Sequence, residues 1–446
     1  GAAPVPALQQ PEGSSLVAWP TWQLSLALSG ALLCPGPGRL RMVAVGTHPT
    51  LTLEATSMLR EAALASGALQ VELLGTLGIT YKCAVFPSMC PSAAEDGAGG
   101  AAQGDPVAEL IGAFEAPPPY ESYTLSVIEE AMQAVGRQLL QSGLDLLVCT
   151  SPYIICATLR LATGAPLLGY LGLPLLWKRP TDHFDNATAR SRFWGMLQQL
   201  LAEPDVVLAT NNPLGSEQIS FQAPGARLPV VRPHAAFTEA AYAPSRLDTA
   251  LLVSRTKFLW VTMGCALRRF TPQGYPVSFE VANSDSKMSF QEMASFRAVV
   301  LMPWEHALMA FFEFYSMAVP LLMPDALWAT RLVFDPDGNL GGTVGAYADA
   351  DPSCAPPGLG CDGARHPFSP FALASLEARR YWYQYSSFAQ FPHIHRFSSI
   401  PELLEKLPSV DLAQTSASMK AFNDLTLVQS SAFWRGAVCA LVPACG

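Results

Sequence analysis

The chain has 446 residues, enough for two or three domains at ~100–200 residues each, and a formal net charge of −9. Half of the residues are apolar and only 14% are charged, which excludes a disordered chain and supplies a large core. No block of like charges occurs along the sequence, so we expect no dedicated surface for nucleic acid or for an anionic membrane.

The chain opens with an uncharged, largely apolar region, residues 13–38. Within it, residues 16–34 are long enough to span a membrane. Pro20 and several polar residues favour a buried strand or hairpin, with a membrane anchor as the alternative. Because the sequence begins with Gly1 rather than Met, an unseen signal or anchor upstream also stays open, and membrane association with it.

Two regions of the chain alternate short apolar strands with helical periodicity. The first predicts strands at 41–45, 144–149, 166–170, 205–209 and 227–231, and helices over 51–65, 127–142, 154–161 and 189–201. This alternation predicts a parallel α/β sheet with helices on both faces. An Ala/Gly-rich stretch at 91–107 interrupts the region as a flexible insertion.

The second region begins near residue 256. It predicts strands at 257–262, 296–302, 320–324 and within 389–397, and helices over 305–318, 401–407 and 412–441. Between the two regions, periodicity lapses near 236–254. We therefore expect an N-terminal domain over residues 1–240 and a C-terminal domain over 241–446.

The ten cysteines favour local disulfides. The predicted pairs are Cys83 with Cys90, Cys354 with Cys361, and Cys439 with Cys445. Such bridges indicate an oxidising compartment, which a single sequon at Asn186 supports weakly. The secretory pathway, in the lumen of the endoplasmic reticulum or the Golgi, is therefore the predicted location, with reduced cysteines in the cytoplasm as the alternative. No Cys/His cluster has zinc spacing, so no metal site is expected.

The most informative segment is the predicted helix over 305–318, which is apolar nearly all round and is therefore expected to be buried. Glu313 lies in its middle, and a buried carboxylate needs a donor or a cavity. A core Arg or backbone amides would satisfy it structurally, whereas a ligand with vicinal hydroxyls would satisfy it functionally. Glu305 lies at the predicted helix start, where it favours the helix dipole and where a phosphate would also bind.

These residues resemble a known family. Glu305, seven intervening residues, Glu313 and then Pro320 are similar to the E-x7-E segment of retaining glycosyltransferases with the GT-B fold. That family reads E, seven residues, E-A-M-A-x-G-x-P, and this chain has Ala318 where the family has glycine. The resemblance implies two Rossmann-like domains facing each other, with the C-terminal helix, 412–441, crossing back to the first domain.

The resemblance also implies roles for residues of the second domain. Glu313 would bind the ribose hydroxyls of a nucleotide-sugar donor, and Glu305, near the donor sugar, would be the catalytic residue. A basic pair would neutralise the diphosphate, whose charge grows in the transition state. The other predicted donor-binding residues are Gly264, Arg268, Arg269 and His306, with Lys287 as a further basic candidate. A solvated surface turn is the alternative interpretation of the arginines.

On the acceptor side, loops at the carboxyl ends of first-domain strands are expected to face the ligand. His48 follows the first strand, and Lys178, Arg179 and His183 follow the strand at 166–170. These four residues are predicted to contact the acceptor, with an ordinary turn and an exposed loop as the alternatives. His234, near the interdomain linker, is a similar candidate.

The sequence therefore predicts a glycosyltransferase that moves a hexose from a nucleotide sugar to a glycan or other hydroxyl acceptor, without a cofactor and without an obligatory metal. One alternative is a glycosyltransferase-like domain that has lost catalysis and acts as a binding or assembly subunit. Another is a bilobal small-molecule binding protein. Signatures of serine hydrolases, zinc proteases and P-loop NTPases are missing from the sequence.

Overall fold

The structure is a computed structural model. It describes residues 38–46, 48–66, 69–77, 123–176, 180–183, 186–223, 226–254, 257–282, 288–333, 366–370 and 375–441. Several predictions fall outside these residues: the segment at 16–34, the insertion at 91–107, Lys178, Arg179, Lys287, Cys83, Cys90, Cys354, Cys361 and Cys445.

The first domain is built on a five-stranded sheet with strand order β2-β1-β3-β4-β5, in which every pair is parallel. Its strands are β1 (Gly38–Gly46), β2 (Leu69–Leu77), β3 (Leu146–Ser151), β4 (Leu167–Leu171) and β5 (Val206–Thr210). Its helices are α2 (Pro49–Ser66), α5 (Leu125–Gln141), α6 (Tyr153–Thr163), α7 (Ala187–Ala202) and α8 (Pro213–Gln222), with a short 3-10 helix η5 (Thr181–His183). The central strands β3 and β4 are buried along their whole length, as continuous apolar runs in a parallel sheet require.

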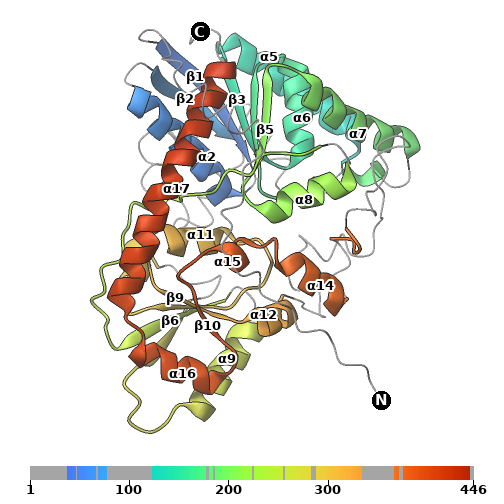
Figure 1. The fold of residues 1–446 in the computed structure, drawn as a ribbon. Helices are drawn as coiled ribbons and strands as arrows, with labels where there is room; N and C mark the ends of the chain where they lie inside the picture. The colour runs from blue at the N-terminus through green and yellow to red at the C-terminus, as the bar shows by residue number, and fades with distance from the viewer. Residues whose placement is uncertain are drawn as a thin grey trace.

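The second domain repeats this plan with a five-stranded parallel sheet in the order β10-β9-β8-β6-β7. Its strands are β6 (Thr249–Val253), β7 (Ser278–Ala282), β8 (Val299–Leu301), β9 (Leu321–Pro324) and β10 (His395–Phe397). Its helices are α9 (Lys257–Phe270), α10 (Phe290–Ala294), α11 (Met309–Ser316), α12 (Ala326–Leu332), α14 (Leu376–Tyr383), α15 (Ser387–Gln390) and α16 (Ile400–Ser409), and a 3-10 helix η6 (Ala236–Thr238) precedes the domain. The two α/β domains, one above the other in Figure 1, confirm the predicted GT-B architecture.

Two strand predictions are wrong. Residues 227–231 form no strand, since only Val230 makes an isolated bridge, to Thr210. Residues 257–262 begin helix α9, and the first strand of the second sheet is β6, which lies inside the predicted linker. Aromatic and β-branched residues at 258–262 favour a strand locally. Leu259, Met263 and Leu267, spaced by four residues, are all buried on the core side, so tertiary packing of this stripe makes the segment helical.

The last helix, α17 (Leu412–Leu441), connects the two domains. Met419, near its start, lies in the core of the second domain, whereas Trp434, near its end, is fully buried in the first domain. The Trp434 ring meets the ring of Tyr170 edge to face, with centroids 5.1 Å apart. The helix therefore crosses back to the first domain as predicted, which Figure 1 shows in red. Among the described helices, none is both long enough and apolar enough to cross a bilayer.

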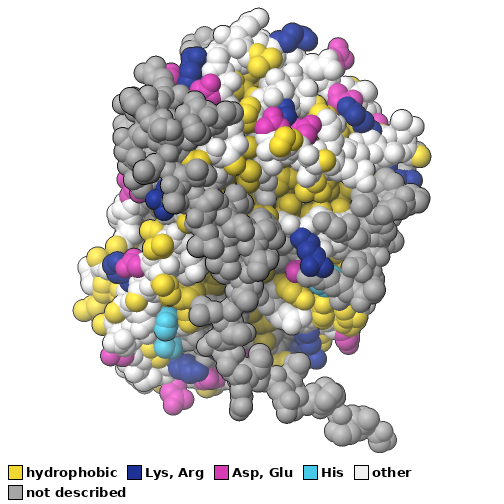
Figure 2. Space-filling model, turned by 45° about the horizontal axis from the view of Figure 1, so that its top comes forward, with side chains coloured by type: hydrophobic (Ala, Val, Ile, Leu, Met, Phe, Trp, Pro, Cys, Tyr) yellow, Lys and Arg dark blue, Asp and Glu magenta, His cyan; other side chains and the backbone are white. Residues whose placement is uncertain are grey.

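The surface view in Figure 2 shows described basic and acidic side chains scattered singly and intermixed over one face of the molecule. Apolar side chains lie between them. This distribution fits a chain in which only 14% of residues are charged.

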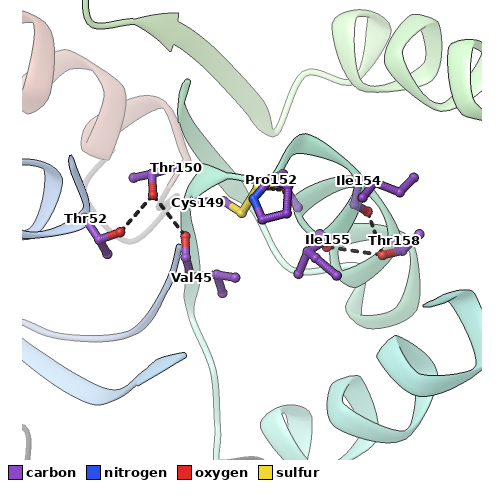
Figure 3. The surroundings of a disulfide bond; sticks show 9 residues. Val45, Thr52, Cys149, Thr150, Pro152, Ile154, Ile155 and Thr158 are labelled. Atoms are coloured by element: carbon purple, nitrogen blue, oxygen red, sulfur yellow. Dashed lines mark hydrogen bonds between the residues drawn. A yellow bond between two sulfur atoms is a disulfide. The ribbon is translucent and has the colours of Figure 1, made fainter. Parts of the chain in front are cut away.

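A disulfide joins Cys149 at the end of β3 to Cys156 in the first turns of α6 (Figure 3). Both cysteines are buried, and this pair was not among those predicted, although it has the same spacing of seven residues. Cys439 also takes part in a disulfide. Cys265 is a free, exposed cysteine.

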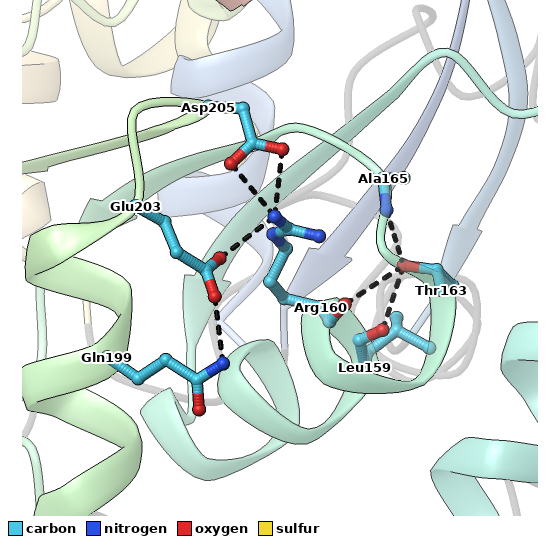
Figure 4. A network of polar contacts seen from close by, with 7 residues as sticks. All are labelled: Leu159, Arg160, Thr163, Ala165, Gln199, Glu203 and Asp205. Atoms are coloured by element: carbon cyan, nitrogen blue, oxygen red, sulfur yellow. Dashed lines mark hydrogen bonds and ion pairs between the residues drawn. The ribbon is translucent and has the colours of Figure 1, made fainter.

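A cluster of charged side chains links helix α6 to the amino end of strand β5 (Figure 4). The buried guanidinium of Arg160 in α6 lies 2.8 Å from a carboxylate oxygen of Glu203 and 2.8 Å from one of Asp205. These two acids flank the turn that leads from α7 into the amino end of β5. This arrangement ties α6 to the sheet far from the carboxyl edges, so we assign it a structural role.

Candidate functional site

The carboxyl edges of the two sheets are turned toward each other. Asn211, which follows β5, donates from Nδ2 to the Met309 sulfur at the start of α11, over 3.5 Å. Leu53 of α2 packs within the core of the second domain. Ligands of open α/β sheets bind outside the carboxyl ends of the strands, so the loops that follow these strands are the candidate site.

His48 lies between β1 and α2 on the first-domain side of this edge. Its carbonyl accepts hydrogen bonds from the backbone N–H and the hydroxyl of Thr52, both at 3.2 Å. These bonds form the first turn of α2, which starts at the next residue. Its ring nitrogen Nδ1 lies 3.2 Å from the hydroxyl of Thr50, and that contact orients the half-buried imidazole. At Gly46, an added Cβ would come within 2.1 Å of the hydroxyls of Thr52 and Thr150, so only glycine fits beside this loop.

Neutral hydroxyl and amide groups accompany His48 on this edge. The hydroxyls of Thr52 and Thr150 are 2.8 Å apart, and the side chains of Asn211 and Asn212 hydrogen-bond to each other. Asn212 also caps α8 by accepting from the backbone N–H of Gly215. The two asparagines were not predicted as site residues, although Asn-Pro at a helix start is a recognisable capping signal.

The loop after β8 departs from the prediction. Helix α11 begins at Met309, four residues later than expected, so Glu305 does not lie at its N-terminus and the predicted helix-end phosphate site there is wrong. Trp304, His306 and Leu308 are buried, and their packing holds the loop in a non-helical course despite the helical spacing of the sequence. Glu305 remains at the carboxyl edge, in a loop.

Glu313 is less enclosed than the apolar helix around it predicted. It lies half-buried on α11, while its neighbours Phe312 and Phe314 are fully enclosed. No described side chain or backbone group makes a hydrogen bond or ion pair with its carboxylate. Burial raises its pKa to about 7. An unpaired carboxylate in such surroundings is costly, and a ligand that donates hydroxyl groups would remove that cost.

His306 and Arg379 form a second polar group beside the same loop. The imidazole of His306 is buried, and its Nε2 has no hydrogen-bond partner among the described residues. Burial, and then the nearby charge of Arg379, lower its pKa to about 4, so the ring is neutral. Arg379 of α14 is buried as well and donates to the carbonyl of Arg331. Arg379 was not predicted, because its position beside the loop depends on contacts between elements far apart in sequence.

The three donor-site residues predicted just after the strand at 257–262 lie on helix α9 instead. Gly264 is in the middle of α9, where an added Cβ would meet no atom within 4 Å, so no close approach requires glycine. Arg268 and Arg269 are exposed in the last turn of α9. A crossover helix runs antiparallel to its strands, so this turn lies at the end of the domain opposite the carboxyl edge. The geometry therefore gives no support to the predicted diphosphate contact.

Two predicted histidines of the first domain differ in their surroundings. His183 ends η5, which Asp182 ties to the start of α5 by accepting from the N–H of Leu125. His234 is buried beside α17, with Nε2 3.0 Å from the hydroxyl of Ser430. Within the described part of the chain, no group of three His, Cys, Asp or Glu residues is arranged to hold a metal ion.

No protein-family model matches the chain, and no curated protein matches its sequence. Among solved structures, the glycotransferase of kitacinnamycin is 11% identical, with 89% of this chain and 98% of that chain covered and a TM-score of 0.38. Spinosyn rhamnosyltransferase SpnG complexed with thymidine diphosphate is 12% identical, with 86% and 96% covered and a TM-score of 0.36. Phytolacca americana UGT2 complexed with UDP-2fluoro-glucose and pterostilbene is 13% identical, with 85% and 99% covered and a TM-score of 0.31. The fold assignment rests on the two sheets of this chain.

Proposed function

We propose that the protein transfers a hexose from a nucleotide sugar, bound by the second domain, to a hydroxyl acceptor held by the first domain. The observation that carries the proposal is Glu313, an unpaired, desolvated carboxylate on the helix that follows β8. A vicinal diol such as that of ribose donates two hydrogen bonds to one carboxylate. The pattern Glu305-x7-Glu313, at the meeting carboxyl edges of two parallel sheets, supports the same conclusion.

In this proposal, the loop after β8 holds the rest of the donor. Departure of the nucleotide diphosphate adds negative charge, which a nearby cation stabilises. Arg379, beside the loop through His306, is better placed for this than the arginines of α9. Its fixed positive charge would serve without a metal. Glu305 would lie against the donor sugar, and the E-x7-E pattern favours retention of the anomeric configuration, which the anomer of the product would test.

On the acceptor side, His48 is the residue oriented for contact. The hydroxyl of Thr50 lies beside its Nδ1, and the neutral groups on the same edge, Thr150 and Asn211, match hydroxyl groups rather than charges. An imidazole at this edge can hydrogen-bond the acceptor hydroxyl and take up its proton during transfer. A glycan or glycoconjugate is the proposed acceptor. The disulfide between Cys149 and Cys156 supports the proposed location in the secretory pathway.

Calorimetric titration of UDP, GDP, thymidine diphosphate and their sugar conjugates tests the donor site. We expect micromolar binding by the wild type, lost in Glu313→Ala and retained in Glu405→Ala, an exposed acidic residue of α16 that serves as a matched control. Equal binding by the wild type and Glu313→Ala would remove the donor assignment. No binding of any nucleotide would remove the proposed function.

The alternative is a glycosyltransferase-like binding or assembly subunit. The specific observation in its favour is the position of Arg268 and Arg269, far from the carboxyl edge where a basic pair is expected. Release of nucleotide diphosphate from a sugar nucleotide separates the two candidates. Nucleotide binding without turnover, over a panel of acceptors, would favour the binding subunit.

A further inference from the structure

The linker between the two sheets, which includes residues 232–235, is anchored to the first domain by Glu54. Its side chain is completely buried in α2, and its two carboxylate oxygens accept the backbone N–H groups of His234 and Ala235, each at 2.7 Å. Such charge-assisted pairs are short and directional. α2 starts directly after His48, so one rigid helix carries the acceptor-side loop at its start and holds the linker one to two turns later.

The same linker is anchored to the second domain by Arg232. Its guanidinium lies over the rings of Tyr315, Phe391 and Phe422, at 5.2, 4.4 and 4.9 Å from their centroids. It also donates to the side chains of Asn423 and Thr426 in α17. Cation–π contacts are stronger when the cation is desolvated, as this buried guanidinium is, so the linker is fixed rather than free to rotate.

Asn423 extends this contact to the helix that carries the donor-side carboxylate. Its Nδ2 donates to the carbonyl of Tyr315 at 2.8 Å and to that of Ser316 at 3.3 Å. These are the last carbonyls of α11, less than one turn beyond Glu313. A continuous series of buried contacts therefore runs from α2 through the linker and α17 to α11.

We propose that Glu54, Arg232 and Asn423 are positioning residues that fix the separation between His48 on the acceptor side and Glu313 on the donor side. This inference rests on the proposed function for its catalytic consequence. All three side chains are buried, so they would act through the elements that they connect. Their effect is to hold the acceptor side of the first domain and the donor side of the second domain at a fixed separation. A shift of about 1 Å between them lowers the rate of transfer by about 100-fold.

The test uses the full chain with Asn423→Asp, which keeps the acceptor for Arg232 but removes both donors to α11. Arg232→Lys keeps the charge and removes the planar stacking, and it serves as the second variant if the first does not fold. Asp424→Ala, the exposed neighbour of Asn423 on α17, is the matched control. Two readouts are taken: transfer kinetics with donor and acceptor varied separately, and the distance distribution between spin labels on exposed Arg137 and Glu405, one in each domain.

We expect Asn423→Asp to lower kcat by about 10- to 100-fold and to broaden the label distances. Nucleotide affinity should stay within about twofold of the wild type, because the donor contacts lie within one domain. Asp424→Ala should change neither readout. A variant with an unchanged distance distribution and unchanged kcat would overturn the proposal. If the wild type transfers no sugar, the proposed function fails, and the label distances alone still decide whether these residues set the domain arrangement.

Discussion

The ionised side chain of Glu313 is expected to lower the free energy of unfolding of the protein. Its folded-state pKa of about 7, against an ordinary 4.5, means that the folded chain holds this proton more tightly than the unfolded chain does. The stability linked to that proton is fully present below pH 4.5 and is lost as the pH rises through about 7. Since one pKa unit corresponds to about 1.4 kcal/mol, the ionised side chain costs about 3 kcal/mol at pH 8, and partial exposure lowers this figure.

Glu313→Gln imitates the protonated side chain at every pH. The variant should exceed the wild type in free energy of unfolding by less than about 1 kcal/mol at pH 5 and by about 2–3 kcal/mol at pH 8. Urea unfolding at half-unit pH steps, with unchanged m-values, measures the difference. A residual slope is expected in the variant, because burial also raises the pKa of Glu54 to about 7. Parallel curves for the two proteins would refute the reasoning and show that the carboxylate has a partner when folded.

Three other substitutions, one of them with a matched control, test separate parts of the structure. Glu402→Gln should show the opposite pH dependence, because Lys406 and Ser398 lower the pKa of the Glu402 carboxyl to about 2. The carboxylate therefore stabilises the folded chain at neutral pH, and this stabilisation is lost on acidification. Thermal unfolding of wild type and variant from pH 2 to 7 measures the difference. Ala318 has a φ of +57°, so Ala318→Gly should raise the free energy of unfolding by about 1 kcal/mol in chemical denaturation. The control Ala310→Gly, inside α11, should lower it by about 1 kcal/mol. Trp434→Ala should cost about 3–5 kcal/mol and expose the first-domain core to a hydrophobic dye; a loss under 1 kcal/mol would contradict the packing described.

Much of the fold was predictable from periodicity. The final helix was predicted over 412–441, as observed, because a long helical pattern has only one interpretation at that length. β6 was missed because Thr249–Val253 is a five-residue run in a region rich in Ala, Thr and Pro. It forms a strand because it pairs with β7 and β8. Short apolar runs are ambiguous between strand and helix until their partners are known.

A candidate site residue can be recognised in the sequence where it conflicts with its surroundings. Glu313 is conspicuous because a carboxylate interrupts an apolar helix, and that conflict exists in the sequence itself. Arg379 gives no such signal, since another arginine follows it and only packing of α14 makes the first one buried and the second one exposed. The late start of α11 was also unpredictable, because distant contacts of Trp304 and Leu308 decide it.

The crossing of α17 also determines the order in which the protein can fold during its synthesis. The last strand of the first sheet ends at Thr210, but Trp434, which completes the core of that domain, is translated about 220 residues later. At a synthesis rate of ~5–20 residues per second, the gap is roughly 10–45 s. Throughout that interval the face around Tyr170 has no covering helix. The nascent first domain should therefore bind chaperones until the chain is finished, and it should aggregate when expressed without its final helix.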